Sequence, residues 1–477
     1  MVPVGSIDTG LDNEEYMQAV QSLSALVLAA GKGTRMHSDR PKVLHTLLGE
    51  PMLWYVLEAV RTLAGQGAYT VIGHGADLVR KQFPDERFIL QKEQLGTGHA
   101  ALSAWPEILA SKARWCLVVN GDTPLVEEQM LERFCAAMMH DEVDLAFVTT
   151  TLEDPGSYGR VVRDGSGLVS GIVEAKDFDP KRHGEPTGEI NAGIYLLRVA
   201  SMGPLLSKIS AENKQGEYYL TDLVDLAVRD GLRVGTLNAG DVADPLSCMG
   251  VNSPLELADS EDALRRRTVQ ALLRDGVTIH LPDTVSIGPR AVVEPGAEIF
   301  GPCEMYGAVH VCRGAVLESH TWIKNSRISP GSVVRSFSHL EGATVGEGCV
   351  VGPYARLRPD AVLEAGARIG NFVEMKKARL GKNAKAGHLT YLGDADIGED
   401  VNIGAGTITC NYDGKRKHRT EIGPRAFIGS NTALVAPVRI GADALVGAGS
   451  VITKDVPEAS LAVARGRQQC FARRESE

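Results

Sequence analysis

A glycine-rich stretch near the N-terminus carries residue types that bind phosphate. The sequence Ala25-Leu-Val-Leu-Ala-Ala-Gly-Lys-Gly-Thr-Arg-Met36 begins with apolar residues and then alternates glycines with polar residues. Glycines let backbone N–H groups approach an anion closely, and a helix that follows presents its positive end. Arg35 and Lys42 add cations within reach of the same phosphates. The spacing fits neither the dinucleotide fingerprint nor the P-loop, so an ordinary strand-to-helix turn remains the alternative.

Further polar segments follow apolar runs downstream. Gln91–His99 contains small residues that suit a flat nucleotide base, although a loop with Thr97 as a helix N-cap explains it equally well. Asp122 follows an apolar run, and its carboxylate suits a Mg²⁺ ion on a triphosphate or simply forms a turn. The remaining segments of this kind are Tyr158–Arg160, Ile172–Lys176, Glu189–Ile194 and Gly250–Asn252.

A histidine in the C-terminal half has neighbours that suit acid–base chemistry on a phosphorylated substrate. His388 lies in the segment Lys385–Tyr391, near a cluster of basic residues. The cluster consists of Arg358, Lys376, Lys377 and Arg379. An imidazole whose pKa lies near neutrality can deprotonate an amine, and the cations suit a phosphate. A structural role for this histidine remains the alternative.

The N-terminal half has the pattern of an α/β domain. The predicted strands are Ala25–Ala29, Tyr69–Ile72, Phe88–Leu90, Cys116–Asn120, Leu145–Thr150 and Ile190–Leu197. The predicted helices include Met52–Leu63, Gly98–Ala110 and Thr221–Asp230. Strands that alternate with helices indicate a largely parallel sheet, with ligands at the carboxyl ends of its strands. The glycine-rich stretch and Asp122 both follow predicted strands.

The C-terminal half is periodic. Apolar anchors recur mostly every six positions over Ile287–Ile323, Val345–Ile403 and Ile422–Ile452, and small or β-branched residues follow many anchors by four positions. Five-residue steps reset the series before Ile403. A hexapeptide repeat of this length predicts a parallel β-helix with about 18 residues per coil. A polar, basic loop, Thr409–Glu421, interrupts the period, and such insertions often form the binding face of a solenoid.

These patterns predict four segments. Residues 1–22 are acidic, lack the basic and apolar parts of a signal peptide, and are expected to be a disordered extension. Residues 23–252 form the α/β domain, residues 253–275 a charged linker helix, and residues 276–477 the β-helix domain.

The composition excludes several classes of protein. A net charge of −10 disfavours nucleic acid as the main partner, because neutralising phosphates requires a basic face. The eight cysteines form no Cys-x-x-Cys pair, so neither zinc nor a disulfide framework is indicated. No apolar run approaches the roughly 20 residues of a membrane span. A cytoplasmic protein without membrane insertion is therefore expected.

Several motifs resemble one known family. Leu28–Met36 followed by Pro41–Leu44 resembles the signature of sugar-phosphate nucleotidylyltransferases. Asn371–Asp394 and Asn402–Gly414 closely resemble the bacterial bifunctional N-acetylglucosamine-1-phosphate uridyltransferase/glucosamine-1-phosphate acetyltransferases. The resemblance extends roughly over residues 24–467. It implies a Rossmann-like nucleotidyltransferase domain, joined by a helical linker to a left-handed parallel β-helix.

The resemblance also implies a chemistry. The C-terminal domain would acetylate glucosamine 1-phosphate with acetyl-CoA. The N-terminal domain would then transfer uridylyl from UTP to N-acetylglucosamine 1-phosphate and release pyrophosphate. The product, UDP-N-acetylglucosamine, feeds peptidoglycan and lipopolysaccharide synthesis. The resemblance further implies Mg²⁺, a homotrimer assembled through the β-helices, and an acetyltransferase site between subunits.

Site residues follow from the matching motifs. Those implied to bind UTP and the sugar nucleotide are Leu28, Ala29, Ala30, Gly31, Arg35, Lys42, Gln91, Gly96, Thr97, Asn120, Gly121, Asp122, Gly159, Glu174, Asn191 and Asn252. Asp122 and Asn252 would hold the metal. His388 would be the general base, helped by Glu374 and Asn411. Those implied to bind the acetyltransferase substrates are Arg358, Lys376, Tyr391, Asn402, Ala405, Asn411, Tyr412, Ser430, Ala448 and Arg465.

Two departures and two rival interpretations remain. The acidic N-terminal extension is unusual for the family. The family often has tyrosine where this chain has Asn120, which puts substrate specificity in doubt more than activity. A single-activity nucleotidylyltransferase is one rival, and the His388 segment and the loop with Asn411 and Tyr412 argue against it. A catalytically inactive interaction protein is the other, and the presence of Arg35, with the other predicted phosphate and metal residues, argues against that.

Overall fold

The computed structural model describes residues 22–471, so nearly all of the predicted N-terminal extension lies outside the described residues. The chain divides into two compact units, Met1–Ala263 and Leu264–Glu477, which are treated separately below. The charged segment predicted as a linker is one long helix, α9 (Pro254–Arg274), and the division between the units falls within it.

The first unit is built on a twisted sheet whose strand order is β11-β7-β10-β6-β1-β4-β5. These strands are β1 (Leu23–Ala29), β4 (Ala68–Ile72), β5 (Phe88–Leu90), β6 (Trp115–Asn120), β7 (Leu145–Thr151), β10 (Glu189–Arg198) and β11 (Val234–Asn238). Strands β6, β1, β4 and β5 run parallel, as predicted, but β10 is antiparallel to both β6 and β7. The sheet is therefore mixed. The antiparallel hairpin β8 (Arg160–Arg163) and β9 (Val169–Val173) attaches to β10, and β2 (Thr46–Leu47) pairs with β3 (Glu50–Pro51).

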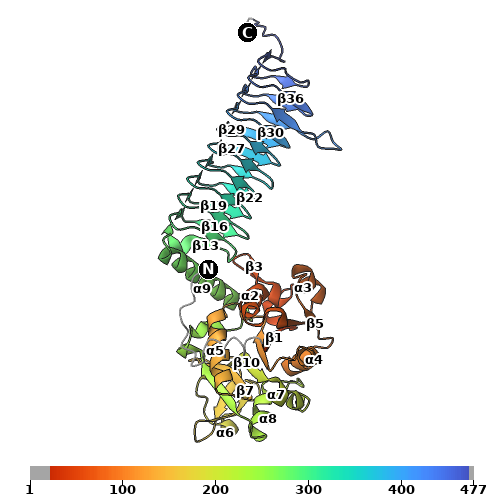
Figure 1. The fold of residues 1–477 in the computed structure, drawn as a ribbon, viewed down its shortest axis with the longest axis vertical. Coiled ribbons are helices and arrows are strands. Elements are labelled where there is room, and N and C mark those ends of the chain that lie inside the picture. The colour runs from red at the N-terminus through yellow and green to blue at the C-terminus, as the bar shows by residue number, and fades with distance from the viewer. Residues whose placement is uncertain (1–21, 472–477) are drawn as a thin grey trace, which may run out of the picture. The chain divides into compact units, whose positions relative to one another are not determined.

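Alternate residues of the central strands pack into two separate hydrophobic cores. Val27 and Val119 pack with the helices α2 (Met52–Ala64), α3 (Ala76–Gln82) and α5 (Glu128–His140). Leu26 and Val118 pack on the other side, with α4 (Thr97–Ala110), α7 (Val199–Leu206) and α8 (Asp222–Arg229). A strand buried on both faces reads as a continuous apolar run, which is the pattern of the predicted strands. Figure 1 shows these helices around the sheet; α6 (Pro180–His183) lies outside both cores.

The segment after the glycine-rich stretch differs from the prediction. Instead of a helix, the chain forms two single turns of 3-10 helix, η1 (Thr34–Met36) and η2 (Lys42–Leu44). Gly33 adopts the left-handed region at φ 62°, and a Cβ there would lie 2.6 Å from Cβ of Lys42. Glycine is needed at this position because the backbone turns tightly against the lysine side chain. Between Thr34 and Leu44, as the structure describes these residues, the chain therefore forms no long helix.

The second unit is a parallel β-helix of three strand ladders (Figure 1). The first ladder contains β12 (Thr278–His280), β15 (Glu298–Phe300), β18 (Val316–Leu317), β21 (Val333–Val334), β24 (Val350–Val351), β31 (Asn402–Ile403), β34 (Phe427–Ile428), β37 (Leu445–Val446) and β39 (Leu461–Ala462). The second contains β13 (Val285–Ile287), β16 (Cys303–Tyr306), β19 (Thr321–Lys324), β22 (His339–Glu341), β25 (Arg356–Leu357), β32 (Ile408–Cys410), β35 (Ala433–Val435) and β38 (Val451–Ile452). The third contains β14 (Val292–Val293), β17 (His310–Val311), β20 (Arg327–Ile328), β23 (Thr344–Val345), β26 (Val362–Leu363), β28 (Arg379–Leu380), β30 (Ala395–Ile397), β33 (Thr420–Ile422) and β36 (Val438–Ile440). Two long strands, β27 (Arg368–Lys376) and β29 (Lys385–Gly393), bend around a corner and belong to the first two ladders.

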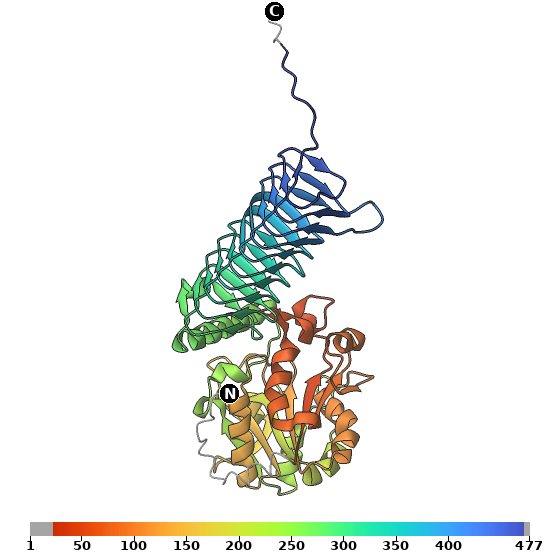
Figure 2. The same ribbon diagram turned by 45° about the horizontal axis from the view of Figure 1, so that its top comes forward.

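The predicted apolar anchors are buried along the axis of this β-helix, which confirms the repeat. The apparent gap in the series is filled by Ile328, Val334 and Leu340, which are also buried and are reached by a five-residue step. The predicted insertion lies between β32 and β33, where Ala395 pairs with Thr420 rather than with a residue about 18 positions on. Figure 2 shows this loop projecting from the stacked coils.

Candidate functional site

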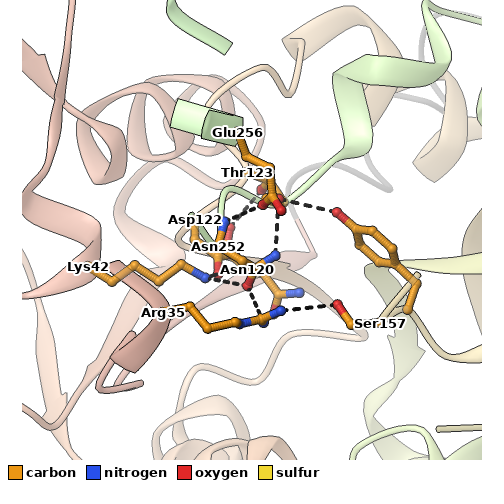
Figure 3. Close-up of polar contacts among 10 residues, drawn as sticks. Arg35, Lys42, Asn120, Asp122, Thr123, Ser157, Asn252 and Glu256 are labelled. Atoms are coloured by element: carbon orange, nitrogen blue, oxygen red, sulfur yellow. Dashed lines mark hydrogen bonds and ion pairs between the residues drawn. The ribbon is translucent and has the colours of Figure 1, made fainter. Parts of the chain in front are cut away.

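Four predicted residues of the first unit converge at the carboxyl ends of β1 and β6. Arg35 donates to Oδ1 of Asn252 at 2.9 Å, and Nζ of Lys42 donates to the same oxygen at 2.8 Å. Lys42 also forms an ion pair with Asp122 (Figure 3). Lys42 is buried, and its stem packs on Gly33. Segments far apart in sequence thus bring two cations against two hard oxygen ligands.

Asn252 is held by the start of α9. Its backbone N–H donates to Oε2 of Glu256 at 2.5 Å, and the N–H of Glu256 donates to Oγ of Ser253 at 3.2 Å. Tyr158 donates its hydroxyl to the Gly250 carbonyl at 3.2 Å, and burial raises the pKa of Tyr158 to about 12. These contacts fix the loop that carries Asn252. The sequence singled out the segments around Tyr158 and Gly250, but not Ser253 or Glu256.

The predicted nucleotide and sugar residues line two adjoining cavities. The first has a volume of about 190 Å³. Predicted residues that line it are Leu28, Arg35, Thr97, Asn120, Asp122, Gly159, Glu174, Asn191 and Asn252. Those that line the second are Leu28, Ala30, Gly31, Gln91, Gly96, Thr97, Asn120 and Asp122. Ala29 is buried and lines neither cavity. A Cβ on Gly121 would lie 3.0 Å from Cβ of Ala29, so Gly121 packs closely against it.

Buried polar contacts organise the deep part of the first cavity. Thr221 donates to Oε1 of Glu174 at 3.0 Å, and burial is the main cause that raises the pKa of Glu174. Asn191 donates to the Tyr195 hydroxyl at 2.6 Å. The amide of Asn120 packs where a Cβ on Gly193 would overlap it. Glycine at that position therefore leaves room for Asn120.

Thr97 is the first residue of α4, so the alternative interpretation of Thr97 as a helix N-cap is wrong. The N-cap residue is Gly96, and Oγ1 of Thr97 instead accepts the N–H of Leu220 at 3.0 Å. Gln91 donates through Nε2 to the carbonyl of Gly96 at 3.1 Å. This loop is therefore tied both to α4 and to the Tyr218–Leu220 segment, which the sequence did not link to it.

In the second unit, His388 lies at the corner where β29 bends. It is exposed, and its Nδ1 lies 2.5 Å from Oδ1 of Asn371, its register partner on β27. The predicted helpers have other partners. Glu374 accepts from Arg358 at 2.8 Å, and Asn411 donates to Asp394 at 2.5 Å.

Three predicted acetyl-CoA residues form a column at the same corner. The N–H of Asn431 donates to the carbonyl of Ala405 at 2.7 Å, and the N–H of Gly449 donates to that of Ser430 at 2.8 Å, so successive coils stack here. The strand registers place Ala405, Ser430 and Ala448 at equivalent positions on the three coils that follow the coil of His388. Arg465 donates to the carbonyl of Ala448 at 2.7 Å. Ser430 and Ala448 are exposed, and Ala405 is half-buried.

Three cations gather beside the second ladder. Arg358 and Lys376 occupy equivalent positions on successive coils, as the register of β25 on β27 requires. Lys417, from the inserted loop, lies against Lys376 and is the main cause that lowers the pKa of Lys376. The sequence marked this loop as basic but did not single out Lys417. Cations held close together repel one another, and an anion between them would relieve this repulsion.

The remaining predicted residues lie around this cluster or on another ladder. The Tyr391 hydroxyl and the Asn411 amide both lie over Gly393, where a Cβ would overlap the hydroxyl. Tyr412 pairs with Lys417 across the inserted loop. Asn402 lies on the first ladder, between Lys385 and Phe427 in register.

One further cluster contains residue types that bind metal ions. Glu294, His310 and Cys312 offer ligand atoms within 4.8 Å of one another. Glu294 already accepts the N–H of Arg313 at 2.9 Å and contacts His310 at 2.8 Å, while Arg327 lies 2.6 Å from Nδ1 of His310. The adjacent guanidinium disfavours a divalent ion, so the contacts form a closed hydrogen-bonded network.

Comparisons with known proteins agree with this arrangement. Residues 25–214 match the MobA-like NTP transferase domain, and residues 419–454 match the bacterial transferase hexapeptide repeat. The bifunctional protein GlmU of Nitratidesulfovibrio vulgaris is 59% identical over 452 residues, covering 94% of this chain and 98% of its own length. The chain belongs to the GlmU family. Membership confirms the predicted fold and the predicted two-activity enzyme of UDP-N-acetylglucosamine synthesis.

Other members of the GlmU family align over similar lengths. That of Oleidesulfovibrio alaskensis is 59% identical, covering 93% of this chain and 96% of its own. That of Stutzerimonas stutzeri is 45% identical, covering 94% and 97%. A solved inositol-1-phosphate CTP transferase from T. maritima covers 49% of this chain and 90% of its own at 18% identity, and its TM-score of 0.37 is too low for comparing sites. Over residues 22–471, none of the helices has the length and apolar character needed to cross a bilayer.

Proposed function

We propose that the cavities of the first unit bind UTP and N-acetylglucosamine 1-phosphate. The convergence of Arg35, Lys42, Asp122 and Asn252 carries this proposal, because phosphoryl-type transfer needs positioning and charge neutralisation more than a protein nucleophile. A phosphate oxygen of the sugar attacks the α-phosphorus of UTP, and pyrophosphate leaves. Arg35 and Lys42 neutralise the charge that develops on the phosphates.

Mg²⁺ suits the two oxygen ligands at this site. The Asp122 carboxylate and the Asn252 amide oxygen are hard donors, and both already contact one cation, the Lys42 ammonium. When bound, the metal would neutralise part of the triphosphate charge. Chelating the divalent ions should abolish pyrophosphate release and leave acetyl transfer intact. Loss of both activities, or of neither, would contradict this assignment.

For acetyl transfer, we infer that His388 is the general base for the C2 amine of glucosamine 1-phosphate. The cluster of Arg358, Lys376 and Lys417 supports a phosphate subsite beside it. The column of Ala405, Ser430 and Ala448 supports a path for acetyl-CoA. The amine attacks the thioester carbonyl, coenzyme A leaves as a thiol, and His388 takes the amine proton. General-base help of this kind is worth roughly 10²–10⁴-fold in rate.

A homotrimer assembled through the second unit is part of the proposal. The rings of His320, Phe337, Tyr354 and Phe372 stack along one corner of the β-helix. Phe337, Tyr354 and Phe372 are 48%, 47% and 57% exposed, and Leu389, next to His388 on the following coil, is 62% exposed. A contiguous exposed apolar strip marks an interaction surface. A second copy packed there would complete the site around His388.

The trimer is tested by sedimentation velocity. Phe372→Ser should shift the protein toward smaller species and lower acetyl transfer. Leu168→Ser, at an exposed apolar residue of the first unit, should change neither. An unchanged sedimentation coefficient for Phe372→Ser would contradict the proposed interface.

The decisive assay supplies glucosamine 1-phosphate, acetyl-CoA, UTP and Mg²⁺, and follows free thiol and pyrophosphate separately. Both should appear, with pyrophosphate lagging behind thiol, because acetylation comes first. Pyrophosphate that appears only when N-acetylglucosamine 1-phosphate is supplied would show that the second unit is not an acetyltransferase. The absence of pyrophosphate under every condition would instead favour an inactive interaction protein.

A further inference from the structure

The only hydrogen bond described for the His388 ring joins it to Asn371. Nδ1 of His388 and Oδ1 of Asn371 lie 2.5 Å apart, which is a short hydrogen bond. The two residues are register partners on β27 and β29, next to the left-handed corner residues Phe372 and Leu389. This register, which continues through Tyr391 opposite Glu374, fixes the spacing between the two side chains.

The partner atom determines the tautomer. An amide oxygen only accepts hydrogen bonds, so Nδ1 of His388 must carry the proton. In the neutral imidazole the lone pair then lies on Nε2, which becomes the basic nitrogen. An unrestrained imidazole would divide between two tautomers and several ring orientations, and only one combination presents a base to the amine.

We propose that Asn371 is a positioning residue that holds His388 with its proton on Nδ1 and its basic Nε2 free for the substrate amine. The inference rests on the proposed role of His388 as the general base. It assigns to Asn371 the function that the sequence resemblance gave to Glu374, whose carboxylate instead accepts from Arg358.

None of the charged side chains described on β27 and β29 has a hydrogen bond to the His388 ring. On β27, Arg368 lies in register with Lys385 of β29, Glu374 pairs with Arg358, and Lys376 lies against Lys417. Strands β31 and β32, on the next coil, carry no charged side chain. Asn371 is therefore the neighbour through which the basicity of His388 can be changed selectively.

Two substitutions at this position separate positioning from binding. Asn371→Ala removes the acceptor, and the kcat of acetyl transfer should fall about tenfold, the effect of one hydrogen bond, with KM for both substrates nearly unchanged. Asn371→Asp keeps the acceptor and adds a negative charge, so the activity should be largely retained. The acidic limb of its pH–rate profile should move to higher pH by about one unit, because a neighbouring carboxylate raises the pKa of an imidazole.

Uridyl transfer by the same preparations provides the folding control, since it belongs to the other unit, and sedimentation velocity checks assembly. A KM effect without a kcat effect in Asn371→Ala would show that Asn371 binds substrate rather than positions the base. An unmoved pH limb in Asn371→Asp would overturn the proposal. His388→Ala tests the underlying assignment independently: if that variant keeps acetyl transfer, the general-base role fails whatever the Asn371 variants do.

Discussion

At the residue scale, Lys42 combines two roles that are hard to replace. Its stem packs on Gly33, and its ammonium joins Asp122 to Asn252. A cation in this position lies where the phosphates would concentrate negative charge, so it would stabilise them directly.

Lys42→Met keeps the apolar stem and removes the charge. We expect the kcat of uridyl transfer to fall by about 10²-fold or more, the usual cost of removing one electrostatic contact to a developing charge. Acetyl transfer should be unchanged. Lys81→Met, on the exposed surface of α3, is the matched control and should leave both activities intact. Comparable uridyl transfer in the two variants would contradict the role of Lys42.

At the element scale, the coils around His388 stack so closely that single atoms matter. A Cβ on Gly370 would overlap the carbonyl oxygen of Gly387 on the next coil, whereas a Cβ on Gly387 would meet open space. Gly370→Ala should destabilise the β-helix by about 1–3 kcal/mol through overpacking. Gly387→Ala is the matched control and should leave the unfolding temperature unchanged. Thermal unfolding followed by circular dichroism makes the comparison, and equal transitions would show that the stack can relax.

Asp222, the first residue of α8, should make the stability of the first unit depend on pH. Burial, helped by the nearby Glu174, Asp225 and Asp177, raises the pKa of Asp222 to about 6. The folded chain therefore holds a proton that the unfolded chain, with an ordinary aspartate, has already released. Stability should fall as the pH rises from about 4 to about 6 and then remain lower.

Asp222→Asn removes this pH-dependent cost. Its unfolding temperature should exceed that of the native sequence at pH 7.5, and the difference should shrink toward pH 4, where both chains carry a neutral side chain. Thermal unfolding of the first unit across this pH range provides the measurement. A constant difference at all pH values would exclude titration of Asp222 as the cause.

At the scale of the whole molecule, the two sites belong to separate compact units of one chain. The product of the acetyltransferase is the substrate of the uridyltransferase. We expect this intermediate to pass from one site to the other through the solution. Lys42→Met and His388→Ala should each fail to make UDP-N-acetylglucosamine from glucosamine 1-phosphate at a normal rate. Mixing the two purified variants should restore synthesis, with pyrophosphate lagging behind thiol. Failure of the mixture would mean that each activity requires the other site intact in the same chain.

The sequence by itself determined the patterned parts of this protein. The strands around Leu28 and Asp122 were predicted because strands buried on both faces are continuously apolar, and the β-helix was predicted because its anchors repeat along the chain. Motifs with fixed spacing, such as the segment around His388, also predicted the family.

Only the tertiary structure decided what depends on segments distant in sequence. The reversal of β10, the single turn after Gly33, and the approach of Lys417 to Lys376 depend on packing and loop conformation, which leave no periodic signal. The partner of His388 is the clearest case. Motif resemblance suggested Glu374, but the register of two coils places Asn371 beside the ring, because neighbours in a β-helix are set by the number of residues in each coil.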